Sequence, residues 1–106
     1  MTTLINLTPH SINLMDGDNN PVQTIESSGV ARCATNKKTV SHINGIPVNS
    51  TTFGQVENLP APADDTVYIV SRLVLSACPD RQDLVVPDDL VRDSQGRIIG
   101  CRAFGV

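Results

Sequence analysis

The sequence feature that most constrains the fold is an Asn-Gly pair at residues 44 and 45, set between two arms of β-prone residues. Residues 40–48 read Val-Ser-His-Ile-Asn-Gly-Ile-Pro-Val. Asn-Gly is typical of a two-residue hairpin turn, because both central positions of that turn need a positive φ. Pro47 has no N–H for a strand ladder, so its arm belongs at a sheet edge or in a bulge. The pattern predicts a β-hairpin over residues 40–48, with 51–56 as a candidate extension of its second arm.

Alternating apolar and polar side chains indicate further half-buried strands along the chain. Pro9 and His10 separate the first two of them, and the turn-forming residues 16–21 separate the second from the third. The run 66–70 is the most apolar, so we expect it to be a central strand. Strands are expected over residues 4–8, 11–15, 22–26, 30–35, 66–70 and 84–86, with a terminal hairpin of 90–92 and 97–102 around a turn at 93–96.

One short helix is expected directly after the central strand. Ser71 is a good N-cap residue and Pro79 ends a helix, so this helix covers about residues 72–78. The expected fold class is therefore α+β, mainly antiparallel β built from hairpins with this one short helix. The length of 106 residues fits a single domain over residues 1–106.

Composition limits how much core the chain can build. The chain is 40% apolar, and its aromatic side chains are Phe53, Tyr68 and Phe104. A small core made mostly of Val, Ile and Leu leaves only modest net stability. Burial of further surface between copies of the chain would add to that stability, so we expect a homo-oligomer.

Charge and cysteine usage argue against several classes of partner and compartment. A net charge of −3 disfavours non-specific nucleic-acid binding and adsorption to an anionic membrane surface. No stretch approaches the ~20 apolar residues of a membrane span, and the first residues lack the pattern of a secretory signal. The cysteines Cys33, Cys78 and Cys101 are odd in number and widely spaced, so we expect reduced thiols in a cytoplasm. Their spacing does not indicate whether any of them is functional.

No motif of catalytic or metal-binding spacing is present in the sequence. The two histidines and three cysteines form neither a C-x-x-C nor an H-x-x-x-H pattern, so we expect no metal and no cofactor. Cys78 lies at the expected helix end, where the macrodipole disfavours a thiolate nucleophile. An enzyme using His10 with a carboxylate from residues 80–89 remains an alternative. The same acids are also typical of a solvated loop with local ion pairs.

The choice of basic residue is the most suggestive chemical feature. Six of the eight cationic residues are arginines, whose planar guanidinium groups match phosphates and carboxylates bidentately. Such a pocket on an acidic protein suits a small anionic ligand, although the eleven acids offer ordinary salt-bridge partners as well. The candidate ligand-binding residues are Arg72, Arg92, Arg97 and Arg102, followed by His10 and Asn6.

Three segments of the chain resemble a family of small phage- and prophage-encoded proteins of unassigned function. They are Leu-Thr-Pro-His at residues 7–10, Tyr-Ile-Val-Ser at 68–71, and Val-Arg-Asp at 91–93 followed by Gly-Arg-Ile-Ile-Gly-Cys-Arg-Ala-Phe at 96–104. The resemblance implies a mobile-element protein that acts in the cytoplasm of a bacterial host. Small accessory proteins of phages often inhibit host defences by binding a defence protein or sequestering a nucleotide signal.

The sequence thus leads to two functional hypotheses. The first is a non-enzymatic binding protein that holds a small phosphorylated or nucleotide ligand and counters host defence signalling. The alternative is a protein–protein interaction module, either an inhibitor of a host protein or a minor structural component of the virion. Such a module needs an exposed edge strand or apolar patch, for which the segment with Pro47 and Phe53 is the candidate.

Overall fold

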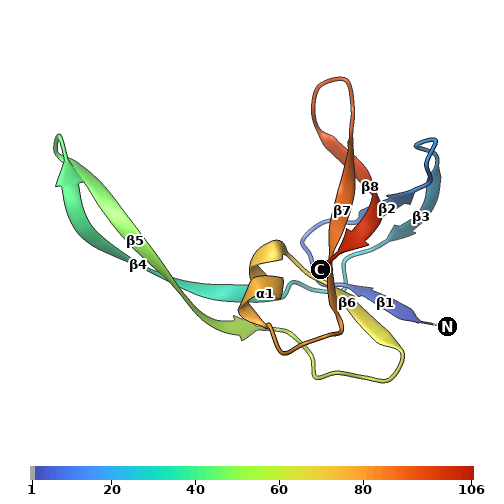
Figure 1. Cartoon of the computed structure of the whole chain (residues 1–106), viewed down its shortest axis with the longest axis horizontal. Helices are drawn as coiled ribbons and strands as arrows, with labels where there is room; N and C mark the ends of the chain where they lie inside the picture. Colours follow the sequence, from blue (N-terminus) through green and yellow to red (C-terminus); the bar gives the residue numbers. More distant parts are fainter. Residues whose placement is uncertain (1) are drawn as a thin grey trace.

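The structure is a computed structural model that describes residues 2–106 (Figure 1). Most of the chain is β-strand, as the alternating sequence patterns predict. The elements in chain order are β1 (Thr3–Asn6), β2 (Ile12–Met15), β3 (Pro21–Ile25), β4 (Arg32–Ile43), β5 (Ile46–Glu57), β6 (Thr66–Ile69), α1 (Arg72–Ala77), β7 (Leu84–Arg92) and β8 (Ile98–Gly105).

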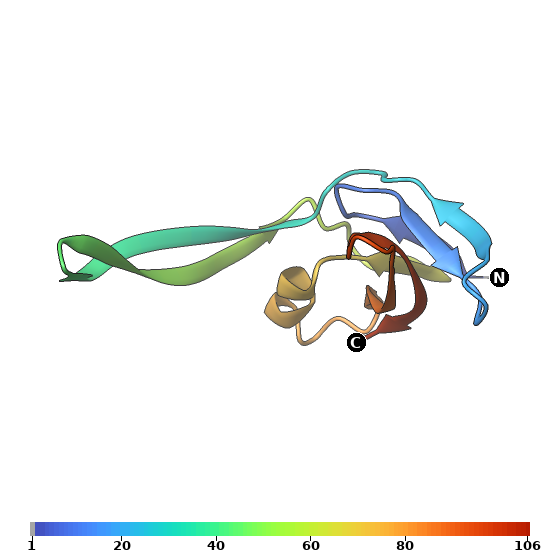
Figure 2. The same ribbon diagram turned by 90° about the horizontal axis from the view of Figure 1, so that it is seen from above.

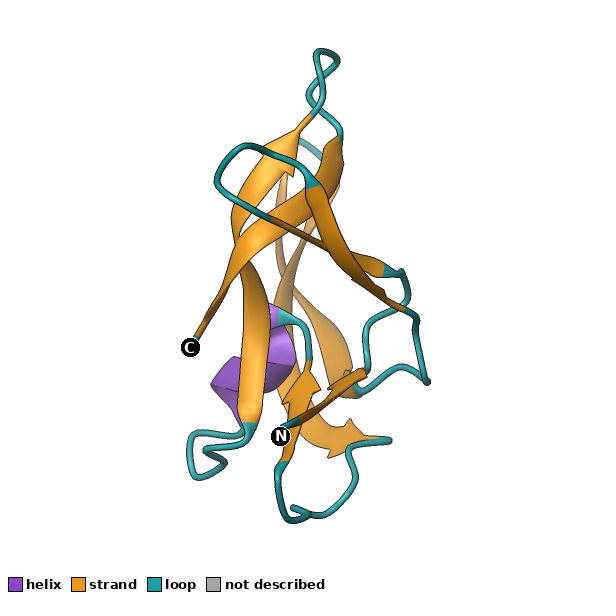
Figure 3. Ribbon diagram, turned by 90° about the vertical axis from the view of Figure 1, so that its right-hand side faces the viewer, coloured by secondary structure: helices purple, strands orange, loops and turns teal. Residues whose placement is uncertain are grey.

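Six of these strands form one strongly curved sheet, in the order β1-β6-β7-β8-β2-β3 (Figure 3). The chain that leaves β3 returns to the opposite edge of this sheet. There Ser27 forms a parallel bridge with Asn6, and the backbone N–H of Ser28 donates to the carbonyl of Asn6 at 2.8 Å. The sheet therefore nearly closes into a small barrel.

The strand order corrects one expectation from the sequence. Three predicted hairpins are present and antiparallel: β2–β3, β4–β5 and β7–β8. However, β1–β6, β6–β7 and β2–β8 are parallel pairs, so the expected mainly antiparallel fold built from hairpins is confirmed only in part. Parallel neighbours need a crossover connection, which α1 supplies between β6 and β7. Turn-forming residues in the sequence indicate a hairpin, whereas no local sequence pattern indicates a crossover between parallel strands.

The core lies on both sides of β6, which runs between β1 and β7 as the most apolar strand. Tyr68 and Val70 point into one cluster with Leu84 and Val74, and each of these side chains is at most 3% exposed. Ile69 points to the opposite side, where it is fully buried in a second cluster that contains Ile12, Ile25 and Cys101. Continuous burial on both faces explains why β6 lacks an alternating pattern.

Helix α1 packs against the barrel through Val74, which is only 1% exposed. Ser71 caps its start as expected, since its hydroxyl accepts a hydrogen bond from the N–H of Val74 at 3.3 Å. The helix ends at Ala77, one residue earlier than predicted. Within residues 2–106, the structure contains no helix with the length and apolarity needed to cross a membrane.

The hairpin predicted around Asn44 and Gly45 is present, and it is far longer than the sequence pattern indicated. Both turn residues have the expected positive φ, 51° and 79°. Strands β4 and β5 are twelve residues long, pair with each other, and project from the barrel as an arm (Figures 1 and 2). The arm raises the radius of gyration to 16.8 Å, against ~13 Å for a compact domain of this length.

Candidate functional site

A cleft lies where β2 separates from the β7–β8 hairpin. Its volume is about 520 Å³, and a second hollow of about 350 Å³ adjoins it towards the start of α1. The two hollows share six lining residues, so we treat them together as the β2/β8 cleft. The shared residues are His10, Ser11, Ile12, Pro87, Leu90 and Ile98.

The cleft exists because β2 and β8 meet over a very short distance. Their register contains one pair, Leu14 with Cys101, and the Asn13 side chain adds a hydrogen bond to the Ile99 carbonyl at 3.1 Å. At Gly100 the two strands are so close that a Cβ atom would lie 2.8 Å from the Asn13 carbonyl oxygen. Beyond this contact the strands diverge and leave the cleft open between them.

Asn6 organises the loop that carries His10 into the cleft wall. Its side chain is fully buried and makes four hydrogen bonds. The amide nitrogen donates to the carbonyls of His10 at 2.8 Å and Ile25 at 3.0 Å, and the amide oxygen accepts from the N–H and hydroxyl of Thr8. Asn6 was a candidate ligand contact, but it lies beneath the wall. It is therefore a positioning residue for the loop from Thr8 to His10.

Arg72 is the charged side chain of the cleft. It is exposed, begins α1, and lines the same hollow as His10, although the two residues are far apart in the sequence. Among residues 2–106, no carboxylate lines either hollow. Within residues 2–106, no acid lies within ion-pair distance of the Arg72 guanidinium. The fold thus brings two of the six candidate residues together.

The other three candidate arginines lie away from the cleft lining and have partners within the β7–β8 hairpin. Arg97 forms an ion pair with Asp93 at 3.1 Å, and Arg102 forms one with Asp89 at 3.4 Å. Arg92 donates to the carbonyl of Gly96 at 2.9 Å. Backbone N–H groups of the turn, first that of Arg97, lower the pKa of Asp93 below its ordinary value. These arginines stabilise the hairpin and its turn.

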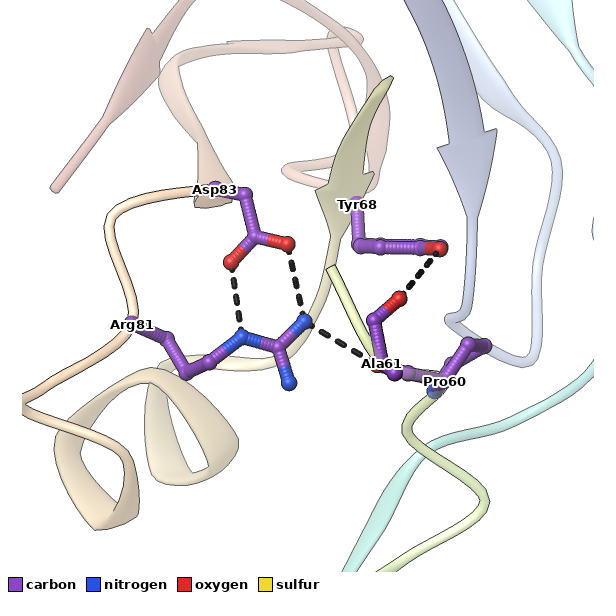
Figure 4. A network of polar contacts seen from close by, with 5 residues as sticks. All are labelled: Pro60, Ala61, Tyr68, Arg81 and Asp83. Carbon is purple, nitrogen blue, oxygen red and sulfur yellow. Dashed lines mark hydrogen bonds and ion pairs between the residues drawn. The ribbon is translucent and has the colours of Figure 1, made fainter. Parts of the chain in front are cut away.

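A second polar network is structural (Figure 4). Arg81 binds Asp83 through two hydrogen bonds of 2.8 Å and donates a third to the carbonyl of Pro60 at 3.0 Å. The Tyr68 hydroxyl donates to the carbonyl of Ala61 at 3.2 Å. The hydrogen bonds from Arg81 lower the pKa of Asp83. These hydrogen bonds hold the connector before β6, which contains Pro60 and Ala61, against the loop before β7, which contains Arg81 and Asp83.

The enzyme alternative needs His10 beside a carboxylate of residues 80–89, and the described residues do not form that pair. Asp83 is engaged by Arg81, and no hydrogen bond joins the His10 side chain to a carboxylate of residues 80–89 in the described structure. Residues 2–106 also contain no group of three or more potential metal ligands. Cys101 lines the cleft at its base, where burial raises the pKa of its thiol.

Sequence reasoning missed the apolar lining of the cleft. Leu90, Ile98 and Ile99 are between 40% and 54% exposed and supply much of its surface. The consecutive isoleucines at 98 and 99 were the available signal, because a strand with one solvated face does not place two large apolar residues in a row. Comparison of the chain with protein-family models, with curated proteins and with solved structures finds no match.

Proposed function

We propose that this protein is a non-enzymatic binding protein whose β2/β8 cleft takes a small anionic ligand, with a phosphorylated compound such as a nucleotide as the leading class. The observation that carries the proposal is Arg72. It is the charged side chain of a cleft lined by no carboxylate, and it has no ion-pair partner within residues 2–106.

The cleft combines polar and apolar groups, which suits a ligand with an apolar body and a charged end. Arg72 lines the hollow near the start of α1, and His10 and Ser11 in the wall shared by both hollows add hydrogen-bond donors. Leu90 and Ile98 in the same shared wall, continued by Ile99 in the larger hollow, offer a surface on which a flat ring can lie. Small-molecule sites commonly have volumes of about 300–1,000 Å³ and combine an apolar lining with a few convergent polar groups. A phosphate at the guanidinium and a base over the apolar surface match this pattern.

Titration of the protein with AMP, cyclic AMP and a cyclic dinucleotide tests the proposal, with adenosine as the uncharged comparison. Amide chemical shifts locate the site, and calorimetry measures the affinity. We expect shifts at residues 8–13 and 98–101, with adenosine binding more weakly than AMP. Arg72→Gln removes a charge-assisted contact worth about 1.5–3 kcal/mol, so affinity for AMP should fall roughly 10- to 100-fold.

Arg97→Gln is the matched control, because Arg97 is also an exposed arginine but is paired with Asp93 outside the cleft. It should bind AMP as the unmodified chain does. If none of the phosphorylated probes shifts the cleft residues, or if Arg72→Gln and Arg97→Gln bind equally well, the proposed site is wrong.

The biological role that we propose for this binding is interference with host defence signalling in a bacterial cytoplasm, by sequestration of a nucleotide signal. This part rests on the resemblance of residues 7–10, 68–71 and 91–104 to small phage and prophage proteins. Phage plaque counts on a defended host, with and without the protein, test it. Plaques should increase with the unmodified chain and stay low with Arg72→Gln.

A second candidate function, a protein–protein interaction module, is favoured by the exposed β4–β5 arm. In that case the protein inhibits a host protein or forms a minor part of the virion. Recovery of one stoichiometric host or virion protein with the unmodified chain, and its loss when the arm tip is altered, would favour this function over ligand binding.

A further inference from the structure

The arm formed by β4 and β5 is exposed on both faces over most of its length. Of the twelve residues in each strand, only Cys33, Val48 and Val56 are even partly buried. A two-stranded hairpin without a third strand or a covering layer is marginally stable in water. The arm therefore has the architecture of a segment that is completed by contact with another molecule.

Apolar side chains gather at the end of the arm. Ile43 and Ile46 face each other directly before and after the turn and are 63% and 66% exposed. Val40 is 60% exposed and Val48 is half-buried beside them. We call these four residues the tip patch. Pro47 on β5, and Lys37 and Lys38 on β4, disfavour the addition of another strand to the edges of the arm. The arm is therefore suited to contact another molecule through one of its two faces.

The net charge of the arm indicates which kind of surface it contacts. Residues 32–57 carry Arg32, Lys37 and Lys38 against a single acid, Glu57, which gives the arm a net charge of +2. The whole chain has a net charge of −3, so the remainder carries −5. Two arms repel each other, whereas an arm and the barrel of a second copy attract.

The acidic part of the barrel lies beside the apolar cleft. The β2–β3 segment over residues 12–26 holds Asp16, Asp18 and Glu26 and no lysine or arginine. Its neighbour in the sheet is β8, whose Ile98 and Ile99 form part of the exposed apolar lining of the cleft. A basic arm with an apolar tip thus matches a surface that is acidic along the β2–β3 hairpin and apolar in the hollow with Ile98 and Ile99, whereas Arg72 lines the neighbouring hollow towards α1.

From this match we infer that the arm of one copy docks on the barrel of a second copy, and that two copies exchange arms reciprocally. In this dimer the tip patch covers the rim of the β2/β8 cleft, and Lys38, which the strand register places on the same face as Val48, lies near the acids of the β2–β3 hairpin. The base of the arm packs against α1 of its own barrel, which leaves residues 36–43 and their partners in β5 free. A strand rises about 3.3 Å per residue, so this free part extends ~26 Å. One face ~10 Å wide then covers about 260 Å² of each surface, and two such contacts total about 1,000 Å², the lower end of the range for a specific interface.

Sedimentation velocity and light scattering measure the association directly. We expect a mass of twice 11.3 kDa for the unmodified chain. The double change Ile43→Ser and Ile46→Ser should give the single-chain mass. Val106→Ser is the matched control, because Val106 is 88% exposed but lies at the end of the chain, outside both surfaces. Near-identical amide spectra of the barrel residues would show that the monomeric variant is still folded.

A charge exchange tests which surface receives the arm. Lys37→Glu with Lys38→Glu should weaken the dimer at least tenfold, and added Asp18→Lys with Glu26→Lys should restore it. Asp64→Lys with Asp80→Lys makes the same charge change elsewhere and should not restore it. A monomer at every soluble concentration, or a dimer that is indifferent to the tip and charge changes, overturns the inference. A monomer that instead binds a different protein through the tip patch also overturns it. Because the tip patch covers the rim of the proposed ligand site, the ligand titrations are repeated with the Ile43→Ser and Ile46→Ser variant, which separates a failure of docking from a failure of ligand binding.

Discussion

Replacing Asn6 by aspartate puts a carboxyl oxygen where an amide nitrogen donates two hydrogen bonds. The side chain is fully buried, and the two acceptors, the carbonyls of His10 and Ile25, are fixed at 2.8 and 3.0 Å. A carboxylate at this position has no proton to donate, so it would lie against two carbonyl oxygens that are also hydrogen-bond acceptors. A neutral carboxyl group can still donate one of the two hydrogen bonds.

The expected loss of stability depends strongly on pH. Burial and the two facing carbonyls favour the neutral acid, and buried carboxyl groups have pKa values raised by up to 3–5 units from about 3.9. At about 1.36 kcal/mol per unit, the pH-dependent loss at pH 7 is up to about 4 kcal/mol, because a side chain whose folded-state pKa exceeds 7 stays neutral in the folded protein. Because the folded-state pKa lies above the unfolded one, stability falls as the pH rises from about 4 through the raised pKa. Below pH 4 the cost shrinks to one lost hydrogen bond, about 1–2 kcal/mol.

Urea unfolding of Asn6→Asp and the unmodified chain at pH 4.5 and pH 7 measures this difference. The gap in unfolding free energy should be several kcal/mol larger at pH 7. Asn49→Asp is the control: Asn49 is exposed on the arm and its oxygen only accepts a hydrogen bond from Thr39. An Asn6→Asp protein that is as stable at pH 7 as at pH 4.5, relative to the unmodified chain, would refute the reasoning.

Three further changes probe the close approach of β2 and β8, the Arg81 network and the turn of the arm. Gly100→Ala forces a Cβ atom against the Asn13 carbonyl, so it should cost about 1–3 kcal/mol in urea unfolding, and a neutral effect would contradict the close approach. Asp83→Asn breaks the pairing with Arg81 and should cost about 1–3 kcal/mol at pH 7. Because the pKa of Asp83 is lowered, the unmodified chain loses this stabilisation only as the pH falls below about 4, and equal acid sensitivity of the two proteins would argue against the pair. Gly45→Val strains a turn with φ of 79°, so amide exchange should accelerate in the arm while the barrel stays protected, and unchanged exchange in the arm would count against the turn geometry.

Local chemistry accounts for what the sequence predicted well. Asn44 and Gly45 specify a hairpin turn through backbone sterics alone, and Ser71 specifies a helix start through one hydrogen bond. Alternation likewise marked the strands of the barrel wall. Each of these signals acts within a few residues, so the identity of elements could be read without knowledge of the fold.

The arrangement of those elements could not be read in the same way. The parallel pairs of β6 with β1 and β7 join residues far apart in the sequence, and their register depends on burial on both faces of β6. The candidate site shows the same limit. Composition drew attention to arginines, but only the fold distinguishes Arg72, which lines the cleft, from Arg97 and Arg102, which pair with acids of their own hairpin.

Asn6 illustrates why a polar residue on a strand is ambiguous in sequence alone. Its spacing from Thr8 and His10 suggested a row of polar side chains on one face. In the structure the same three residues form a small network in which Asn6 is buried and His10 is exposed. Burial decides whether such a polar residue can contact a ligand or instead supports the residues that do, and a local sequence pattern does not determine burial.

The most direct test of the central claim is native mass spectrometry of the protein purified gently from a bacterial cytosol, compared with Arg72→Gln and Arg97→Gln prepared in the same way. A small anionic adduct, or one taken up from added AMP or a cyclic dinucleotide, should remain on the unmodified chain and on Arg97→Gln and be lost from Arg72→Gln. A bare protein that takes up none of these probes, or an adduct that Arg72→Gln retains, would contradict ligand binding at the β2/β8 cleft.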